Sequence, residues 1–176
     1  SKLVLVLVRM ASKCYWVTGL SATGKTSLTI LLAEYLRLNG RKVVLLDGDE
    51  LRKVFANQVY TREERIFTGM QYARLCQLIA SQEVDVIIAV IGLFDEIHLW
   101  NRANIPGYVE VFIDTPLIEL EKRDPKGIYR DFRSGLIKDV AGFDLSVDFP
   151  KNPDILLKWS KGRSIDSMFK ELLKKI

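Results

Sequence analysis

Short apolar runs alternate along the chain with longer segments in which apolar residues recur every three or four positions. The runs predict strands over residues 14–18, 43–46, 84–91, 109–113 and 154–157. The periodic segments predict helices from Gly24 to a stop at Asn39 and Gly40, over residues 62–81 and over residues 164–175. Because the strands are apolar throughout, the pattern predicts an α/β protein of three layers, a parallel sheet of about five strands with helices on both faces.

Two segments depart from this alternation. Residues 123–142 are polar, basic and punctuated by glycine, and we predict that they form a lid. Residues 1–13 include a short apolar run, residues 2–8, which is either an additional edge strand or an N-terminal extension upstream of Met10. No repeat or linker interrupts the rest, so we expect residues 1–176 to form a single domain.

Composition and charge narrow the classes of partner. The net charge is +4 and the Lys and Arg residues are scattered, whereas a nucleic-acid binder would concentrate them on one stripe. No apolar run is long enough to cross a membrane. Cys14 and Cys76 lack metal-ligand spacing, and His98 has no acidic, Cys or His neighbour at such spacing, so we expect both thiols to be buried and His98 to be a surface or packing residue. We therefore expect a cytoplasmic protein without a nucleic-acid or membrane partner.

A phosphate-binding loop follows the first predicted strand and opens the first helix. The segment fits G-x-x-x-x-G-K-[ST] and comprises Gly19, Leu20, Ser21, Ala22, Thr23, Gly24, Lys25 and Thr26, with Ser27 next on the helix. Its backbone N–H groups and the helix N-terminus form an anion site for ATP. Lys25 is expected to reach the β- and γ-phosphates, and the Thr26 hydroxyl to bind Mg²⁺.

Two carboxylates follow the second predicted strand, where ligands of parallel sheets bind. We expect Asp47 to help hold Mg²⁺ and Asp49 to accept a proton from an attacking hydroxyl. Arg52 is placed to hold an anionic acceptor. No Asn-Lys-x-Asp guanine motif occurs, and the chain is short for a motor ATPase, so a small-molecule kinase is favoured.

The sequence resembles the adenylylsulfate (APS) kinase family. Residues 18–26, 46–52, 111–116 and 123–129 match its motifs, and the likeness extends over about residues 16–153. The resemblance implies a P-loop NTPase fold and transfer of a phosphoryl group from MgATP to the ribose 3′-hydroxyl of a nucleotide. It implies catalytic roles for Lys25, Asp47 and Asp49, a lid that closes over both substrates, and a homodimer. The acceptor residues implied are Asp49, Arg52, Arg65, Gly92, Leu93, Phe94, Lys138 and Val140.

Three positions depart from the family pattern on the acceptor side. Gly92 stands for a serine, Asp95 for an arginine and Val140 for a phenylalanine that stacks on the acceptor base. Residues 93–102 resemble a branch of the family associated with capsule decoration, whose acceptor is cytidine diphosphoramidate. We expect that acceptor here. The alternatives are a diverged APS kinase, an ATP-binding regulator without transfer activity, and a kinase of a non-nucleotide alcohol.

Overall fold

The computed structural model describes residues 11–176 and contains a parallel sheet of five strands. The strands are β1 (Cys14–Thr18), β2 (Val43–Asp47), β3 (Asp85–Val90), β4 (Tyr108–Asp114) and β5 (Ile155–Lys158), in the order β2-β3-β1-β4-β5. The central strand β1 pairs with β3 and β4 on its two sides. Its carboxyl end is therefore flanked by the carboxyl ends of both neighbours, so the loops that follow these strands share one edge of the sheet.

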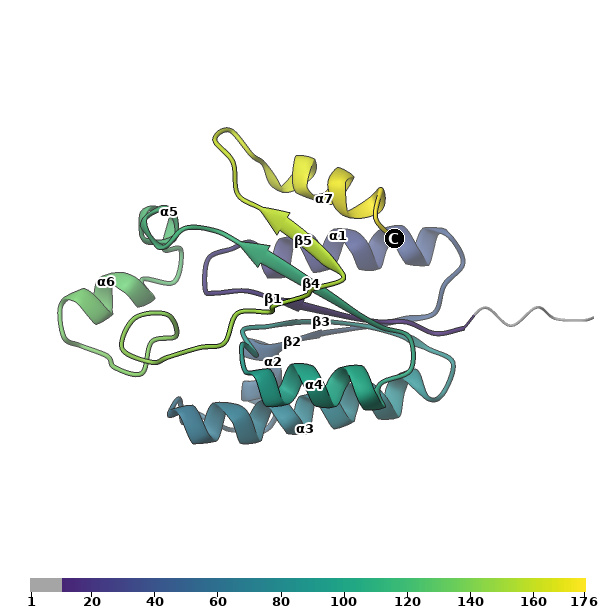
Figure 1. Cartoon of the computed structure of the whole chain (residues 1–176), viewed down its shortest axis with the longest axis horizontal. Coiled ribbons are helices and arrows are strands. Elements are labelled where there is room, and N and C mark those ends of the chain that lie inside the picture. The colour runs from purple at the N-terminus through teal and green to yellow at the C-terminus, as the bar shows by residue number, and fades with distance from the viewer. Residues whose placement is uncertain (1–10) are drawn as a thin grey trace, which may run out of the picture.

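Helices cover both faces of the sheet (Figure 1). On one face lie α1 (Lys25–Leu38) and α7 (Ile165–Leu173), and on the other lie α3 (Arg62–Ala80) and α4 (Asp95–Asn104). Three shorter helices, α2 (Gly48–Val54), α5 (Leu117–Arg123) and α6 (Ile128–Arg133), lie toward the edge at which the strands end. The predicted α/β architecture of three layers is confirmed.

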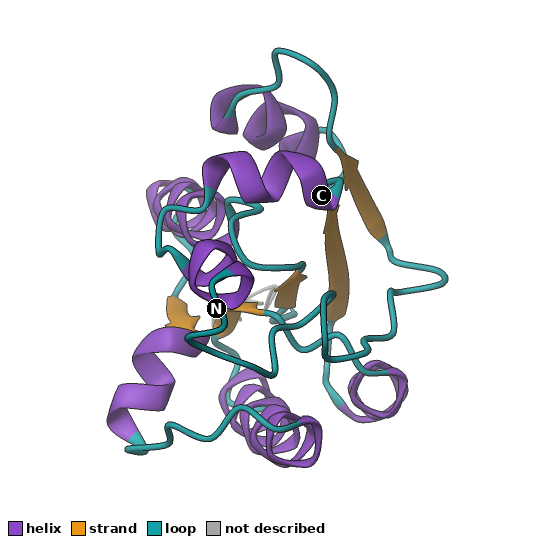
Figure 2. Cartoon of the chain, turned by 90° about the vertical axis from the view of Figure 1, so that its left-hand side faces the viewer, coloured by secondary structure: helices purple, strands orange, loops and turns teal. Residues whose placement is uncertain are grey.

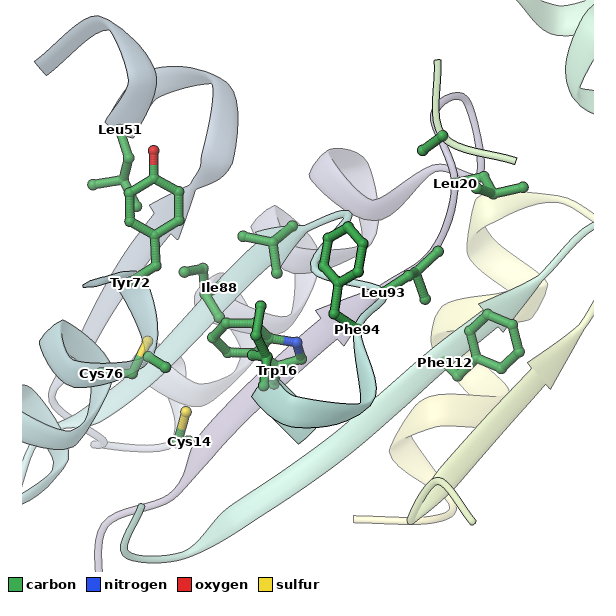
Figure 3. Close-up of a cluster of buried hydrophobic side chains, with 14 of the residues drawn as sticks. Cys14, Trp16, Leu20, Leu51, Tyr72, Cys76, Ile88, Leu93, Phe94 and Phe112 are labelled. Carbon is green, nitrogen blue, oxygen red and sulfur yellow. The ribbon is translucent and has the colours of Figure 1, made fainter. Parts of the chain in front are cut away.

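Each face of the sheet buries its own apolar cluster. The first lies against α3 and includes Trp16, Ile88, Phe94 and Cys76, as Figure 3 shows. The second lies against α1 and α7 and includes Val17, Leu28, Ile113 and Leu172. All six residues of β3 are buried, as the continuous apolar run predicted. Cys14 and Cys76 are both free and buried, as expected.

The predicted strands and long helices agree with the structure to within about two residues at each end. The pattern did not predict α2, α4, α5 or α6. Helices of this length are marginal in isolation and form because neighbouring structure supports them. The start of α2, for example, is held by the Asp47 side chain, which accepts a hydrogen bond from the Asp49 backbone N–H.

Two further expectations concern particular segments. His98 packs inside the protein, 8% exposed, and its Nε2 donates to the Gly92 carbonyl oxygen at 2.8 Å. The strand or extension considered for residues 2–8 lies outside the described residues. Within residues 11–176, no helix combines the length and the apolar character that crossing a bilayer requires.

Candidate active site

A cleft of about 970 Å³ lies at the edge where the strands end. Figure 2 looks onto this edge, so the loops that follow the strands face the viewer. The walls of the cleft are formed by the phosphate loop, the start of α2, one face of α3, the segment after β3, the predicted lid and residues 159–168. A volume of this size is at the upper end of the range for small-molecule sites.

The phosphate loop is bent back onto α1 through left-handed backbone at Gly24. Gly24 has φ 94°, and a Cβ added there would lie 2.6 Å from Cδ1 of Ile165. The Lys25 ammonium donates to the Leu20 carbonyl oxygen at 2.7 Å, and this hydrogen bond connects the end of the loop to its beginning. Three residues of the loop, Gly19, Leu20 and Thr23, are buried and do not line the cleft. The residues that line it are Ser21, Ala22, Gly24, Lys25, Thr26 and Ser27.

Lys25 lies in an environment that disfavours its charge. Loss of hydration and the neighbouring Lys126 ammonium lower the pKa of Lys25 to about 7, while Asp49 and Asp47 act in the opposite direction. An anionic ligand in the loop would supply the missing counter-charge. The electrostatics therefore favour a polyanion at this position.

Thr26 and Asp47 meet across the base of the cleft. The Thr26 hydroxyl donates to Oδ2 of Asp47 at 2.7 Å, and Oδ1 of Asp47 accepts from the Asp49 N–H at 2.9 Å. Both side chains offer hard oxygen atoms, which suit Mg²⁺. Residues 11–176 contain no cluster of three or more acidic, His or Cys side chains that could hold a metal. The pair of Thr26 and Asp47 therefore fits a Mg²⁺ ion whose other ligands are phosphate and water oxygens.

The predicted lid, residues 123–142, reaches the cleft through Lys126, which forms an ion pair with the Asp49 carboxylate. Tyr129 anchors the same segment, because its hydroxyl donates to the Ser21 carbonyl oxygen of the phosphate loop at 2.7 Å. Asp49 is 56% exposed and Lys126 54% exposed, so this pair can exchange partners at little cost. The lid thus contacts both the phosphate loop and the candidate base.

Two predicted acceptor cations gather around one aromatic ring. The Arg52 guanidinium lies 4.2 Å from the centroid of Tyr60 and that of Arg65 lies 5.2 Å from it. Arg65 also donates to the carbonyl oxygen of Asp139 in the lid at 2.8 Å. Burial, and then the charge of Arg52, lower the pKa of Arg65. Lys138 is exposed on the same lid segment and also lines the cleft.

The segment after β3 and the end of the lid supply an uncharged wall. Gly92, Phe94 and Val140 line the cleft, and Phe94 and Val140 are 1% and 5% exposed. Leu93 differs from the other predicted acceptor residues, because its side chain is fully buried in the core and does not line the cleft. Its position leaves no surface through which it could contact an acceptor.

Asp95 lies outside the cleft wall, although it stands where the family pattern has an arginine. Its carboxylate forms an ion pair with the Lys151 ammonium at 3.2 Å, and its backbone N–H donates to the Asp148 carboxylate. The change therefore removes a cation from this part of the site without placing an anion in the cleft.

Sequence reasoning missed several cleft residues. Trp159, Arg163 and Met168 line the wall beyond the phosphate loop, and Arg123 extends toward the Ala22 carbonyl oxygen at 3.5 Å. Tyr60 lies between the two acceptor arginines. Arg123 belongs to a motif segment, so its charge was a usable signal. The others lie in segments without a motif, and only the folding of the chain brings them to the cleft.

Fold, loop and paired carboxylates together define a kinase of the P-loop class. The family model for adenylylsulphate kinase matches residues 11–158. The chain belongs to the adenylylsulphate kinase family, and the predicted resemblance is confirmed.

Relatives with two different names match at similar identity. The cytidine diphosphoramidate kinase of Campylobacter jejuni is 32% identical over 161 residues, covering 92% of this chain and 94% of that protein. The adenylyl-sulfate kinase of Pseudomonas aeruginosa is 36% identical over 154 residues, covering 86% and 79%. The APS kinase CysC of Mycobacterium tuberculosis, solved in complex with AMPPNP and APS, superposes with a TM-score of 0.84 at 34% identity, covering 94% of this chain and 97% of that one.

Proposed function

We propose that this protein transfers the γ-phosphoryl group of ATP to the ribose 3′-hydroxyl of a nucleotide, and that the acceptor is cytidine diphosphoramidate, in the biosynthesis of capsular phosphoramidate. The observation that carries the proposal is the grouping of Lys25, Thr26, Asp47 and Asp49 at one end of a cleft. Arg52, Arg65 and Lys138 also line that cleft, and the part that they line is called the acceptor arm. One arm suits a triphosphate and the other an anionic acceptor.

The residues account for each part of the transfer. Backbone N–H groups of the phosphate loop and Lys25 bind the phosphates, and Thr26 and Asp47 are the groups that would hold Mg²⁺. When bound, Mg²⁺ neutralises charge on the phosphate oxygens. Asp49 accepts the proton of the 3′-hydroxyl as its oxygen attacks the γ-phosphorus. The bond from that phosphorus to the β–γ bridging oxygen breaks, and ADP leaves.

The proposed acceptor rests on the wall that would surround it. Val140 and Gly92 offer no ring and no charge, and Asp95 contributes no cation to the cleft. Stacking on an aromatic side chain contributes roughly 1–3 kcal/mol per base, so a valine in the lid weakens the hold on a purine. A smaller pyrimidine and a phosphoramidate group suit this wall. The likeness to the C. jejuni enzyme along nearly the whole of both chains supports the same acceptor.

APS is the second candidate acceptor. The M. tuberculosis enzyme, whose structure contains APS, superposes on 94% of this chain. The adenylyl-sulfate kinases of P. aeruginosa and Clostridium kluyveri are 36% and 38% identical to it. The acceptor arm described above has the cations that a nucleotide anion needs in either case.

A coupled assay of ADP release with MgATP tests the proposal, with cytidine diphosphoramidate, APS and no acceptor run in parallel. We expect turnover of the cytidine compound and a phosphorylated product whose new phosphate is on the ribose 3′ oxygen, identified by ³¹P NMR. Strong turnover of APS with the cytidine compound inert would make this an APS kinase. ATP binding without acceptor-dependent ADP release from either compound would overturn the kinase assignment for nucleotide acceptors.

A further inference from the structure

Helix α3 presents one face to the acceptor arm of the cleft. Arg65, Thr68, Gly69 and Tyr72 all line the cleft, and their spacing of three, four and seven residues places them on one side of the helix. Arg65 contacts the lid, whereas Tyr72 lies two turns further along the helix and is 4% exposed. The helix therefore runs from the cationic part of the arm to a buried part.

The Tyr72 hydroxyl has no hydrogen-bond partner among residues 11–176, although it is buried. A buried hydroxyl without a partner is destabilising, because it has lost its hydrogen bonds to water without replacing them. A second unpartnered polar atom, Nε1 of Trp16, belongs to another residue that lines the same cleft. A polar atom of a bound ligand would satisfy such groups, so two of them in one arm of the cleft point to a ligand with polar atoms at this position.

The surroundings keep this hydroxyl in place and protonated. The Tyr72 ring stacks on Phe55 with centroids 6.2 Å apart. Burial raises the pKa of Tyr72, and the nearby Arg52 charge only partly opposes that rise. Tyr72 is therefore a neutral phenol at physiological pH, able to donate or accept a hydrogen bond.

Aromatic and small side chains line this part of the arm. Figure 3 shows the Tyr72 and Phe94 side chains on either side of Trp16, with the Tyr72 hydroxyl pointing away from Cys76. Gly69 and Ala89, both small, also line the cleft here. Arg52, Arg65 and Lys138 are the proposed partners of the acceptor's charged groups, so the uncharged side chains beside them are left for an uncharged heterocycle.

We propose that Tyr72 is a specificity-determining residue, whose hydroxyl forms a hydrogen bond with a polar exocyclic group of the acceptor's base. The inference rests on the proposed function, because it takes the acceptor to be a nucleotide. Selectivity then comes from a side chain of α3, in addition to the wall formed by Gly92, Phe94 and Val140. A base that presents no matching group leaves the buried hydroxyl unpaired, which is how a polar site rejects a near-isostere.

The test is Tyr72→Phe, which removes one oxygen atom and keeps the ring. We expect KM for the acceptor to rise about tenfold, as for a lost hydrogen bond to a buried partner, with kcat and the KM for ATP within twofold of the unchanged protein. We also expect the free energy of unfolding to stay level or rise, since an unsatisfied group has gone. An unchanged acceptor KM, or equal changes in both KM values, would overturn the inference.

Tyr108→Phe is the matched control. The Tyr108 side chain is partly buried, and its hydroxyl donates to Glu110 at 2.7 Å. Tyr108 does not line the cleft. Removing it should lower the free energy of unfolding and leave the acceptor KM unchanged. A rise in acceptor KM in both variants would show a general structural effect and overturn the assignment of Tyr72.

Binding measurements separate this inference from the proposed reaction. Calorimetry with CDP, UDP and APS, each added to protein saturated with MgAMPPNP, reports the base preference without turnover. We expect Tyr72→Phe to weaken the tightest of the three by about tenfold and to narrow the spread among them. That result would support the role of Tyr72 even if no acceptor were phosphorylated, whereas equal losses for all three would overturn it.

Discussion

Lys126 of the predicted lid forms an ion pair with Asp49, a carboxylate in the first turn of α2. One carboxylate thus both pairs with a cation of the lid and is the proposed proton acceptor in the reaction. Because both side chains are more than half exposed, the pair contributes little to stability. The pair instead affects the charge around Lys25. Burial and then the Lys126 charge lower the pKa of Lys25, whereas the Asp49 charge raises it.

Asp49→Asn should retain ATP binding and lose most phosphoryl transfer. The amide cannot accept the proton of the attacking hydroxyl, and general-base catalysis typically contributes 10²–10⁴-fold. We expect kcat to fall at least ~100-fold while the dissociation constant for ATP changes by less than about threefold. Glu50→Gln is the control, because Glu50 is exposed and pairs only with Lys53. Normal turnover by Asp49→Asn would show that the base lies elsewhere.

Lys126→Ala should slow transfer by about 10- to 100-fold, since it removes a cation that the lid brings to the reacting phosphates. It should also raise the pKa of Lys25, because the repulsion between the two ammonium groups is lost. Steady-state kinetics with saturating acceptor measures the first effect. Lys122→Ala is the control: Lys122 is exposed on α5, directly before the lid, and does not line the cleft. Equal activity of the two variants would count against a role for the lid lysine.

Lys25→Ala should lower phosphoryl transfer at least ~100-fold with every acceptor, since it removes the charge that stabilises the transferring phosphate. Initial rates of ADP release with each acceptor measure the effect. Lys161→Ala, on an exposed turn outside the cleft, provides the comparison for loss of one positive charge. Near-normal turnover by Lys25→Ala would contradict the assignment of the phosphate loop.

Nucleotide affinity should fall as pH rises above 7. The pKa of Lys25 is about 7 in the empty site, and bound phosphates raise it, so binding above pH 7 takes up a proton. We expect the dissociation constant of MgAMPPNP to increase by up to about tenfold per pH unit between pH 7 and 9. Lys25→Arg should flatten this dependence, because arginine stays charged. An equally steep dependence in that variant would assign the proton to another group.

The same lysine has a consequence for folding. The pKa of Lys25 in the folded protein lies below its ordinary value of 10.5, so the unfolded chain binds more protons between about pH 7 and 10.5. Its contribution to the free energy of unfolding therefore rises with pH across that window and is most unfavourable below pH 7. Comparison of the unchanged protein with Lys25→Met in urea at pH 7 and 9 measures this difference.

Gly92→Ala should destabilise the protein by about 1–3 kcal/mol. Gly92 has φ 46°, and a Cβ there would lie 2.9 Å from Cζ2 of Trp16. Gly135→Ala isolates the backbone contribution, because Gly135 also has positive φ, 77°, with no atom within 4 Å of an added Cβ. Urea unfolding measures both. A loss for Gly92→Ala no larger than that for Gly135→Ala would mean that Trp16 moves aside freely.

The apolar patterning by itself determined the layered parallel sheet, because buried strands need continuous apolar runs and their covering helices need one apolar face. The phosphate loop was equally readable, since its chemistry requires glycines, a lysine and a hydroxyl at a set spacing along one stretch of chain. Loops that follow parallel strands share one edge of the sheet, so the carboxylates of Asp47 and Asp49 could be expected beside Lys25, although β3 separates β1 from β2.

Only the tertiary structure decided which residues complete the acceptor arm. Tyr72 sits in an ordinary apolar stripe of α3, and nothing in its sequence context distinguishes it from a core tyrosine. Asp95 occupies a motif position, yet it does not line the cleft and pairs with Lys151 instead. Leu93 follows Gly92 in the motif but is turned into the core. These outcomes depend on contacts between segments far apart in the chain, and such contacts are set by packing rather than by local pattern.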